Sequence, residues 1–129
     1  MTYGFYSVFA SLFNAETTIV PLRDDFSINI QDYDNITKNI IISNPNSPAG
    51  LFLPLDEIKK LIEKNKDRLI IIDEAYIDFG AETAVPLTKI YDNLLIIRTF
   101  SKSRSLAGGR LGACLLYTSC TAAPLLEAV

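Results

Sequence analysis

In Leu69-Ile-Ile-Ile-Asp-Glu-Ala-Tyr76, four consecutive apolar residues, three of them β-branched, run directly into two carboxylates and a tyrosine. Two similar apolar runs flank this stretch in the sequence, at residues 39–43 and 94–97. Short, nearly continuous runs of this kind are typical of strands that are buried on both faces of a parallel sheet. The sequence therefore predicts an α/β fold with a mostly parallel sheet.

The segments between these runs predict the connections. Residues 54–66 carry apolar residues at helical spacing on one side and charged residues on the other, which predicts an amphipathic crossover helix. The shorter connection at 86–92 predicts one or two helical turns, and right-handed crossovers are expected. Upstream, we expect a helix over residues 3–14 and a further strand over 17–22.

Composition narrows the class of protein. The chain has 129 residues, of which 49% are hydrophobic, which is enough for one globular core. A net charge of -3 provides no basic surface for nucleic acid. The apolar runs are far shorter than the roughly 20 residues of a membrane helix, and no signal-peptide pattern opens the sequence. We expect a cytoplasmic protein that acts on small molecules and binds neither nucleic acid nor membrane.

The inventory of reactive side chains excludes several kinds of site. The sequence has no histidine, and its two cysteines are Cys114 and Cys120. Two cysteines cannot build a disulfide framework, and without histidine a mixed Cys/His metal site cannot form, so we predict no metal site. Serine–histidine and cysteine–histidine nucleophiles are excluded for the same reason. Any base must be a lysine, a tyrosine or a carboxylate.

Polar clusters follow each of the three predicted strands, at residues 44–50, 73–76 and 99–102. Open α/β sheets bind ligands at the carboxyl ends of their parallel strands, so the three clusters are expected to converge on one site.

Lys102 in the third cluster has the surroundings of a Schiff-base lysine. An amine condenses with a carbonyl only when it is often unprotonated, which desolvation or neighbouring cations favour. Arg98, Arg104 and Arg110 lie close to it in the sequence. These features predict pyridoxal 5'-phosphate as the cofactor, because its sites pair such a lysine with an acidic partner for the ring nitrogen.

The other polar residues have matching chemistry. Asp73 would pair with the ring nitrogen, while Tyr76 and Asn46 would contact the phenolic oxygen of the cofactor. Ser101 and Arg110 would bind the phosphate. Each residue taken alone also has an ordinary structural role, as a helix cap, a half-buried aromatic, a turn residue or a surface arginine.

Four motifs, in this order, resemble the histidinol-phosphate aminotransferase family of fold-type I pyridoxal-phosphate enzymes. They are Tyr3-Gly-Phe-Tyr6, Asn44-Pro-Asn-Ser-Pro-Ala-Gly50, Ile72-Asp-Glu-Ala-Tyr-Ile-Asp-Phe79, and Arg98-Thr-Phe-Ser-Lys with Leu106-Ala-Gly-Gly-Arg-Leu-Gly112. The resemblance implies that residues 1–113 form part of the pyridoxal-phosphate-binding large domain, a mostly parallel sheet with crossover helices.

The resemblance also implies roles. Lys102 would be the catalytic Schiff-base lysine and proton shuttle, and Tyr3 would stack on the cofactor ring. Asn46, Asp73 and Tyr76, with Ser101 and Arg110, would keep the contacts given above. The implied reaction of the parent enzyme, expected to be a homodimer, transfers an amino group from L-histidinol phosphate to 2-oxoglutarate in histidine biosynthesis. We expect the 129-residue chain to be inactive alone.

Three alternatives remain open at this point. The family loop reads closer to Asn-Pro-Asn-Asn-Pro-Thr-Gly, so position 47, a serine here, could hold the ring-oxygen contact instead of Asn46. Phosphothreonine decarboxylases and aromatic or aspartate-type aminotransferases share the motifs. The run at 69–74 also resembles the second acidic motif of phosphate-loop nucleotide hydrolases, although no Gly-x-x-x-x-Gly-Lys-[Ser/Thr] string occurs.

Residues 114–129 have a different character. After Ala113 the family pattern stops, and residues 114–119, Cys-Leu-Leu-Tyr-Thr-Ser, match the translation of a transposon-end adapter used in preparing sequencing libraries. We predict that this tail is not native, with a divergent final strand and loop as the alternative.

Resequencing the locus tests the tail. We expect the genomic reading frame to depart from the printed sequence at about Cys114. An unbroken frame through Val129 would refute the prediction.

Overall fold

The computed structural model describes residues 2–116. Its helices and strands are α1 (Phe5–Leu12), β1 (Ile40–Ser43), α2 (Leu55–Lys64), β2 (Ile70–Asp73), β3 (Leu94–Thr99) and β4 (Gly112–Leu116). Short 3-10 helices occur at Ile30–Tyr33, Ile77–Phe79, Val85–Lys89 and Ala107–Gly109. The three predicted strands and the crossover helix are therefore present, each within one or two residues of its predicted start.

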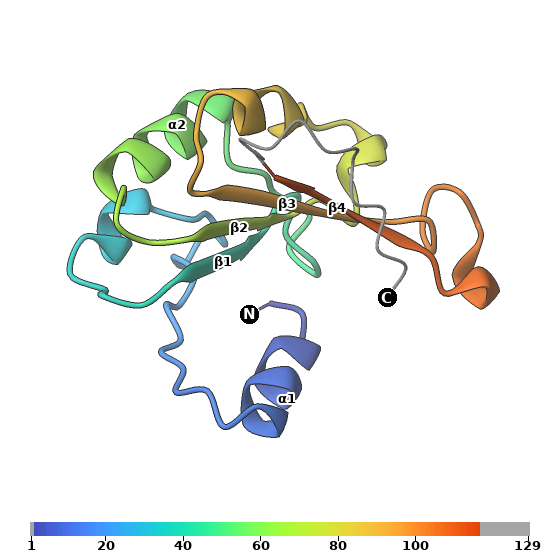
Figure 1. The fold of residues 1–129 in the computed structure, drawn as a ribbon, viewed down its shortest axis with the longest axis horizontal. Helices are drawn as coiled ribbons and strands as arrows, with labels where there is room; N and C mark the ends of the chain where they lie inside the picture. The colour runs from blue at the N-terminus through green and yellow to red at the C-terminus, as the bar shows by residue number, and fades with distance from the viewer. Residues whose placement is uncertain (1, 117–129) are drawn as a thin grey trace.

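The four strands form one sheet in the order β1-β2-β3-β4 (Figure 1). β1, β2 and β3 are parallel, and β4 runs antiparallel to β3. The parallel strands are in matched register, so that Ile42 pairs with Ile72 and Ile72 with Ile96. This confirms the predicted α/β class and the mostly parallel sheet.

The core lies between the sheet and α2. α2 lies on one side of the sheet (Figure 1), and alternate residues of the parallel strands, which form one cluster with α2, are almost completely buried. From α2 and the turns beside it, further apolar side chains complete one cluster. Its members are Ile30, Ile40, Ile42, Leu53, Ile58, Leu61, Ile62, Ile70, Ile72, Ala84, Leu87, Leu94 and Ile96.

Local sequence explains where α2 begins and ends. Pro54 precedes it in an extended conformation, and Asp56 and Glu57 lie in its first turn, where carboxylates interact favourably with the helix dipole. Lys64 lies in its last turn, where a cation has the same effect. At the following residue, the Asn65 side chain donates to the Leu61 carbonyl at 2.6 Å, which satisfies a carbonyl that the helix end leaves open.

The opposite face of the sheet is only partly covered, which differs from the predicted burial on both faces. Ile41 is 39% exposed, and α1, which lies on this side in Figure 1, has no buried residue. The apolar runs were therefore correct indicators of strands but not of complete burial in this chain.

The predicted strand over residues 17–22 is wrong. This segment has no regular secondary structure, although its sequence is rich in β-branched residues. Strand formation depends on pairing with a neighbouring strand, and β1 pairs with β2 along one edge only. The segment is instead held by Lys38, whose ammonium group contacts Thr18 at 3.2 Å and Glu16 at 2.9 Å.

The first three residues of the predicted non-native tail belong to β4, the last strand of the described chain. Cys114, Leu115 and Leu116 pair with Ile97, Ile96 and Leu95 of β3. The remainder of the predicted non-native tail, residues 117–129, lies outside the described residues, and the prediction for the whole tail stays a prediction.

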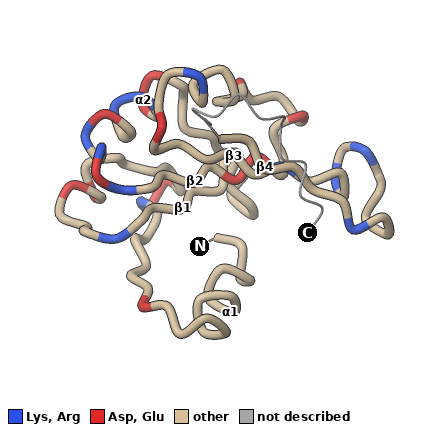
Figure 2. The backbone as a smooth tube through the Cα atoms, viewed as in Figure 1, with Lys and Arg blue, Asp and Glu red and all other residues tan. Residues whose placement is uncertain are grey.

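Charges are unevenly distributed along the chain (Figure 2). Residues 2–15, which include α1, carry no charged side chain, whereas α2 is rich in charges of both signs. The stretch 98–112 carries four basic residues and no acidic one. Across residues 2–116, no helix is long and apolar enough to cross a membrane.

The central strand β3 provides a test of the core. Ile96 is completely buried, so Ile96→Ala should lower the free energy of unfolding by about 2–5 kcal/mol. Ile90→Ala is the matched control, because Ile90 is 70% exposed, and should change it by no more than about 0.5 kcal/mol. Urea unfolding measures both, and equal losses would contradict the described packing.

Candidate active site

The carboxyl ends of the three parallel strands meet at one edge of the sheet. Ser43 of β1 pairs with Asp73 of β2, and Asp73 pairs with Ile97 of β3. Just beyond these pairs, the Asn44 amide donates to the Asp73 carbonyl and the Glu74 amide to the Ile97 carbonyl, both at 2.8 Å. The first two polar clusters therefore emerge at the same level, and the third begins two residues further on, because β3 continues to Thr99 beside β4.

Asn44 shapes the first cluster. Its buried side chain accepts a hydrogen bond from the Leu53 amide at 2.6 Å and donates to the Leu53 carbonyl at 3.2 Å, as a paired strand would. Inside the loop closed by this pair, the Asn46 amide donates to Leu51 and its side-chain oxygen accepts from the Ala49 amide. Asn46 is 5% exposed, and Ser47 beside it is more accessible.

Asp73 lies at the centre of the edge and is held from two sides. The Tyr6 hydroxyl of α1 donates to its Oδ2 atom at 2.5 Å, and the Ala75 amide donates to its Oδ1 atom at 3.0 Å. Burial of Tyr6 and its hydrogen bond to the Asp73 carboxylate raise the Tyr6 pKa above its ordinary value. The hydroxyl therefore keeps its proton and remains a donor.

Lys102 lies beside Tyr76. Its Nζ atom lies 5.3 Å from the centre of the Tyr76 ring, a cation–π contact that joins the second and third clusters. Two of the arginines near it in the sequence are engaged elsewhere. Arg98 pairs with Glu74 at 2.8 Å, and Arg104 lies 3.6 Å from Asp78.

Glu74 forms a buried ion pair behind the edge. Its carboxylate accepts two hydrogen bonds from the Arg98 guanidinium, at 2.8 and 2.9 Å. It also accepts from the Thr83 hydroxyl and from the Ala84 amide, the latter at 2.6 Å. The Glu74 side chain is 1% exposed, so this carboxylate is fully engaged inside the protein.

Ser101 and Arg110 lie at the two ends of the loop between β3 and β4. Thr99 pairs with Gly112, so the residues just after Thr99 are brought close to those just before Gly112. The Phe100 amide donates to the Leu111 carbonyl at 3.1 Å, which closes the loop. Arg110 is exposed and has a positive φ of 47°, in the left-handed region.

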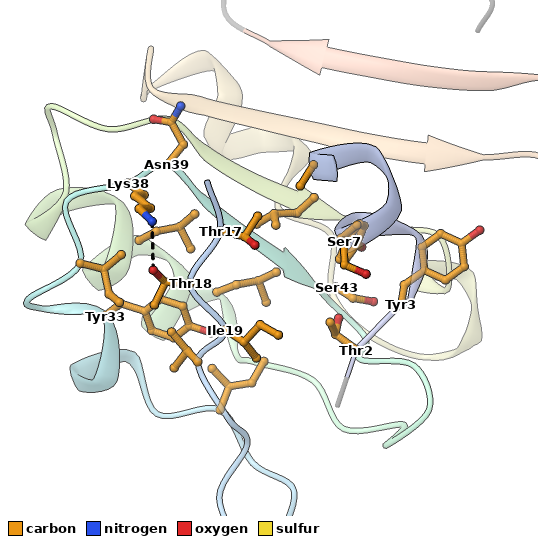
Figure 3. Close-up of a pocket in the computed structure, with 18 of the residues that line it drawn as sticks. Thr2, Tyr3, Ser7, Thr17, Thr18, Ile19, Tyr33, Lys38, Asn39 and Ser43 are labelled. Carbon is orange, nitrogen blue, oxygen red and sulfur yellow. Dashed lines mark hydrogen bonds between the residues drawn. The ribbon is translucent and has the colours of Figure 1, made fainter. Parts of the chain in front are cut away.

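Two cavities adjoin the edge. The larger, of about 590 Å³, lies between β1, α1 and the segment 16–22 (Figure 3), and Tyr3, Tyr6, Ser43 and Asn46 are among its lining residues. The smaller, of about 310 Å³, is lined by Asn46, Ser47 and Tyr76, among others. Lys102, Ser101 and Arg110 line neither of these two cavities.

The structure therefore brings the predicted residues together in part. Tyr3 and Asn46 share one cavity, Asn46 and Tyr76 share the other, and Lys102 contacts Tyr76. Two polar contributors, Tyr6 and Glu74, were not predicted. Glu74 stands directly after Asp73, and the alternation of side chains along a strand could have indicated that the two carboxylates face opposite sides. No local pattern points from Tyr6 to Asp73.

The family model for aminotransferase class I and II matches residues 1–128. The chain therefore belongs to this aminotransferase family, which confirms the resemblance seen in its motifs.

Curated relatives make the match more specific. The chain is 59% identical over 113 residues to the histidinol-phosphate aminotransferase of Brachyspira hyodysenteriae, covering 87% of this chain and 32% of the relative. It is 51% identical over 112 residues to histidinol-phosphate aminotransferase 1 of Oceanobacillus iheyensis, with the same coverage. The chain thus spans about a third of the length of these relatives.

Solved structures share the fold. The histidinol-phosphate aminotransferase of Clostridium acetobutylicum is similar with a TM-score of 0.82 and 27% identity, over 89% of this chain and 37% of that one. The enzyme of Sinorhizobium meliloti, solved in complex with pyridoxal-5'-phosphate, has a TM-score of 0.80 at 22% identity, over 89% of this chain and 34% of that one. The latter likeness concerns the fold alone.

The Glu74–Arg98 pair provides a test of the site's framework. Glu74→Ala leaves the partly buried Arg98 and the Ala84 amide without their partner, so the free energy of unfolding should fall by about 3–5 kcal/mol. Glu57→Ala, which removes a more exposed partner of Lys60 on α2, is the control and should have a much smaller effect. Equal shifts of the urea midpoint would contradict the buried pair.

Proposed function

We propose that the chain is part of a pyridoxal-phosphate-dependent aminotransferase that acts on L-histidinol phosphate, with 2-oxoglutarate as amino acceptor, in histidine biosynthesis. The observation that carries this proposal is the contact of Lys102 with Tyr76, on the sheet edge where Asp73 presents its carboxylate. The names of the curated relatives support the substrate.

The side chains present fit the cofactor. Lys102 provides an amine for its aldehyde, and Asp73 a carboxylate for its ring nitrogen. Each Asp73 oxygen has one donor in the structure and can accept another, so the carboxylate retains capacity for the ring N–H. When bound, the cofactor would supply an electron sink for the substrate carbon that loses its proton.

The phosphate would be held by the loop between β3 and β4. Ser101 supplies a hydroxyl and Arg110 a planar guanidinium that can bind two phosphate oxygens at once. The closure of this loop by the Phe100–Leu111 hydrogen bond supports the assignment, because it brings the two residues to the same end of the sheet. The absence of acidic residues over 98–112 also favours an anion here.

The phenolic oxygen of the cofactor would be contacted by Tyr76 and by the loop after β1. Asn46 and Tyr76 line the same cavity, which supports their joint role. The Asn46 side-chain oxygen is engaged with the Ala49 amide, so its NH2 group would be the donor. Ser47 lines the same cavity and is the alternative donor.

Lys102 would also move the proton. With its amine unprotonated, Lys102 would take a proton from the substrate carbon and return it at another position. Tyr76 lies against its ammonium group and would keep the side chain directed at the site. Tyr3, which lines the larger cavity with Asn46, would stack on the cofactor ring.

Partners follow from the same assignment. The substrates are a small-molecule amino donor and a 2-oxo acid, and we propose a cytoplasmic homodimer for the full-length enzyme. Exposed apolar side chains of α1, such as Phe5 and Phe9, support a further contact surface.

The nucleotide-hydrolase alternative is not supported. It would need Glu74 to serve magnesium and water, whereas four donor groups already engage this carboxylate in the protein interior. A related pyridoxal-phosphate enzyme remains the second candidate. The fold of the Porphyromonas gingivalis L-threonine-O-3-phosphate decarboxylase matches with a TM-score of 0.75, at 24% identity.

The full-length gene product tests the assignment. With pyridoxal phosphate, borohydride should fix the cofactor onto Lys102, and the enzyme should convert L-histidinol phosphate and 2-oxoglutarate. Lys102→Ala should abolish both, because it removes the amine that lies beside Tyr76 at this edge. Lys60→Ala, on the exposed face of α2, is the matched control and should leave both intact.

Two results would contradict the proposal. A cofactor adduct that persists in Lys102→Ala would exclude this lysine. Turnover of phosphothreonine with no turnover of histidinol phosphate would replace the proposed reaction with the decarboxylase alternative.

A further inference from the structure

We propose that Tyr6 is a positioning residue for the cofactor: its hydroxyl orients the Asp73 carboxylate toward the ring nitrogen. This inference rests on the proposed function. It assigns a role to a residue that the sequence motifs leave without one.

The geometry at Asp73 is the first support. The Tyr6 hydroxyl binds Oδ2 at 2.5 Å and the Ala75 amide binds Oδ1 at 3.0 Å. A carboxylate held by one donor on each oxygen has a fixed plane, since rotation about its Cβ–Cγ bond would break both hydrogen bonds. The remaining lone pairs then point in set directions, which is what a linear hydrogen bond from a ring N–H requires.

The protonation state of Tyr6 is the second support. Burial and the neighbouring Asp73 carboxylate both raise its pKa, while a hydrogen bond with Ser43 acts in the opposite direction and is the smaller influence. Tyr6 therefore stays neutral at physiological pH. It donates to Asp73 without adding a negative charge that would compete for the ring N–H.

The position of the Tyr6 ring is the third support. It meets the Tyr3 ring edge to face, with centroids 5.5 Å apart and planes at 83°. This arrangement is among the favourable ones for aromatic pairs. One side chain thus contacts both the residue proposed to stack on the cofactor and the carboxylate proposed to bind its nitrogen.

The Tyr6–Asp73 bond also spans the fold. It joins residues 67 positions apart in sequence, one on α1 and one at the end of β2. Since α1 has no buried residue, a hydrogen bond to its one half-buried tyrosine at this point ties the helix to the site rather than to the core.

The test compares the affinity of the full-length gene product for two probes. One is pyridoxal phosphate, and the other is its 1-deaza analogue, in which carbon replaces the ring nitrogen. Tyr6→Phe keeps the ring and removes the hydroxyl. We expect it to weaken pyridoxal phosphate binding about tenfold, the effect of losing roughly one hydrogen bond to a charged group, and to leave binding of the analogue unchanged.

Tyr91→Phe is the matched control. The Tyr91 hydroxyl also donates to a carboxylate, that of Glu63, at 2.7 Å, but this pair lies on the exposed surface near α2. This variant should bind both probes as the unmodified protein does.

A double-mutant cycle separates positioning from general support of the fold. In an Asp73→Asn background, Tyr6→Phe should have no further effect on pyridoxal phosphate affinity, because the carboxylate it orients is gone. An equal loss for both probes, additive effects in the cycle, or a Tyr6→Phe affinity equal to that of Tyr91→Phe would overturn the inference alone. If the unmodified protein does not attach the cofactor to Lys102, the proposed function and the inference both fail.

Discussion

The matched register of the three parallel strands is the constraint on which the site depends. β1 and β2 end at Ser43 and Asp73, at the level of Ile97, and β3 ends two residues later at Thr99, so the segments after all three strands leave the sheet at the same edge. Clusters that are about 25 to 30 residues apart in sequence thereby become neighbours, and Lys102 reaches the Tyr76 ring. A shift of one residue in any strand would turn its side chains to the other face and separate them.

Successive side chains along β2 and just after it point to opposite faces of the sheet, so the adjacent acids Asp73 and Glu74 make different contacts. Asp73 faces the side of the sheet where α1 lies and receives the Tyr6 hydroxyl, whereas Glu74 is directed inward to Arg98. A buried carboxylate is costly without a partner, so Arg98 serves the framework rather than the environment of Lys102. Fewer unpaired cations therefore surround Lys102 than the sequence suggests.

Local patterns predicted the parts of the fold that depend on local physics. The β-branched runs and the amphipathic spacing of α2 sufficed for the central strands and the helix, and the motifs sufficed for the family. Residues 17–22 have strand composition without a strand partner, which composition cannot reveal. The Tyr6–Asp73 bond joins positions that no periodicity connects, so only the folded arrangement discloses it.

The weak anchoring of α1 has a consequence for the cooperativity of the molecule. A helix with no buried residue can detach in a local unfolding step well below the free energy of global unfolding, and its amides would then exchange with solvent before those of the sheet. Detachment would take Tyr6 away from Asp73. Such a step would link the orientation of the carboxylate at the centre of the edge to the docking of α1.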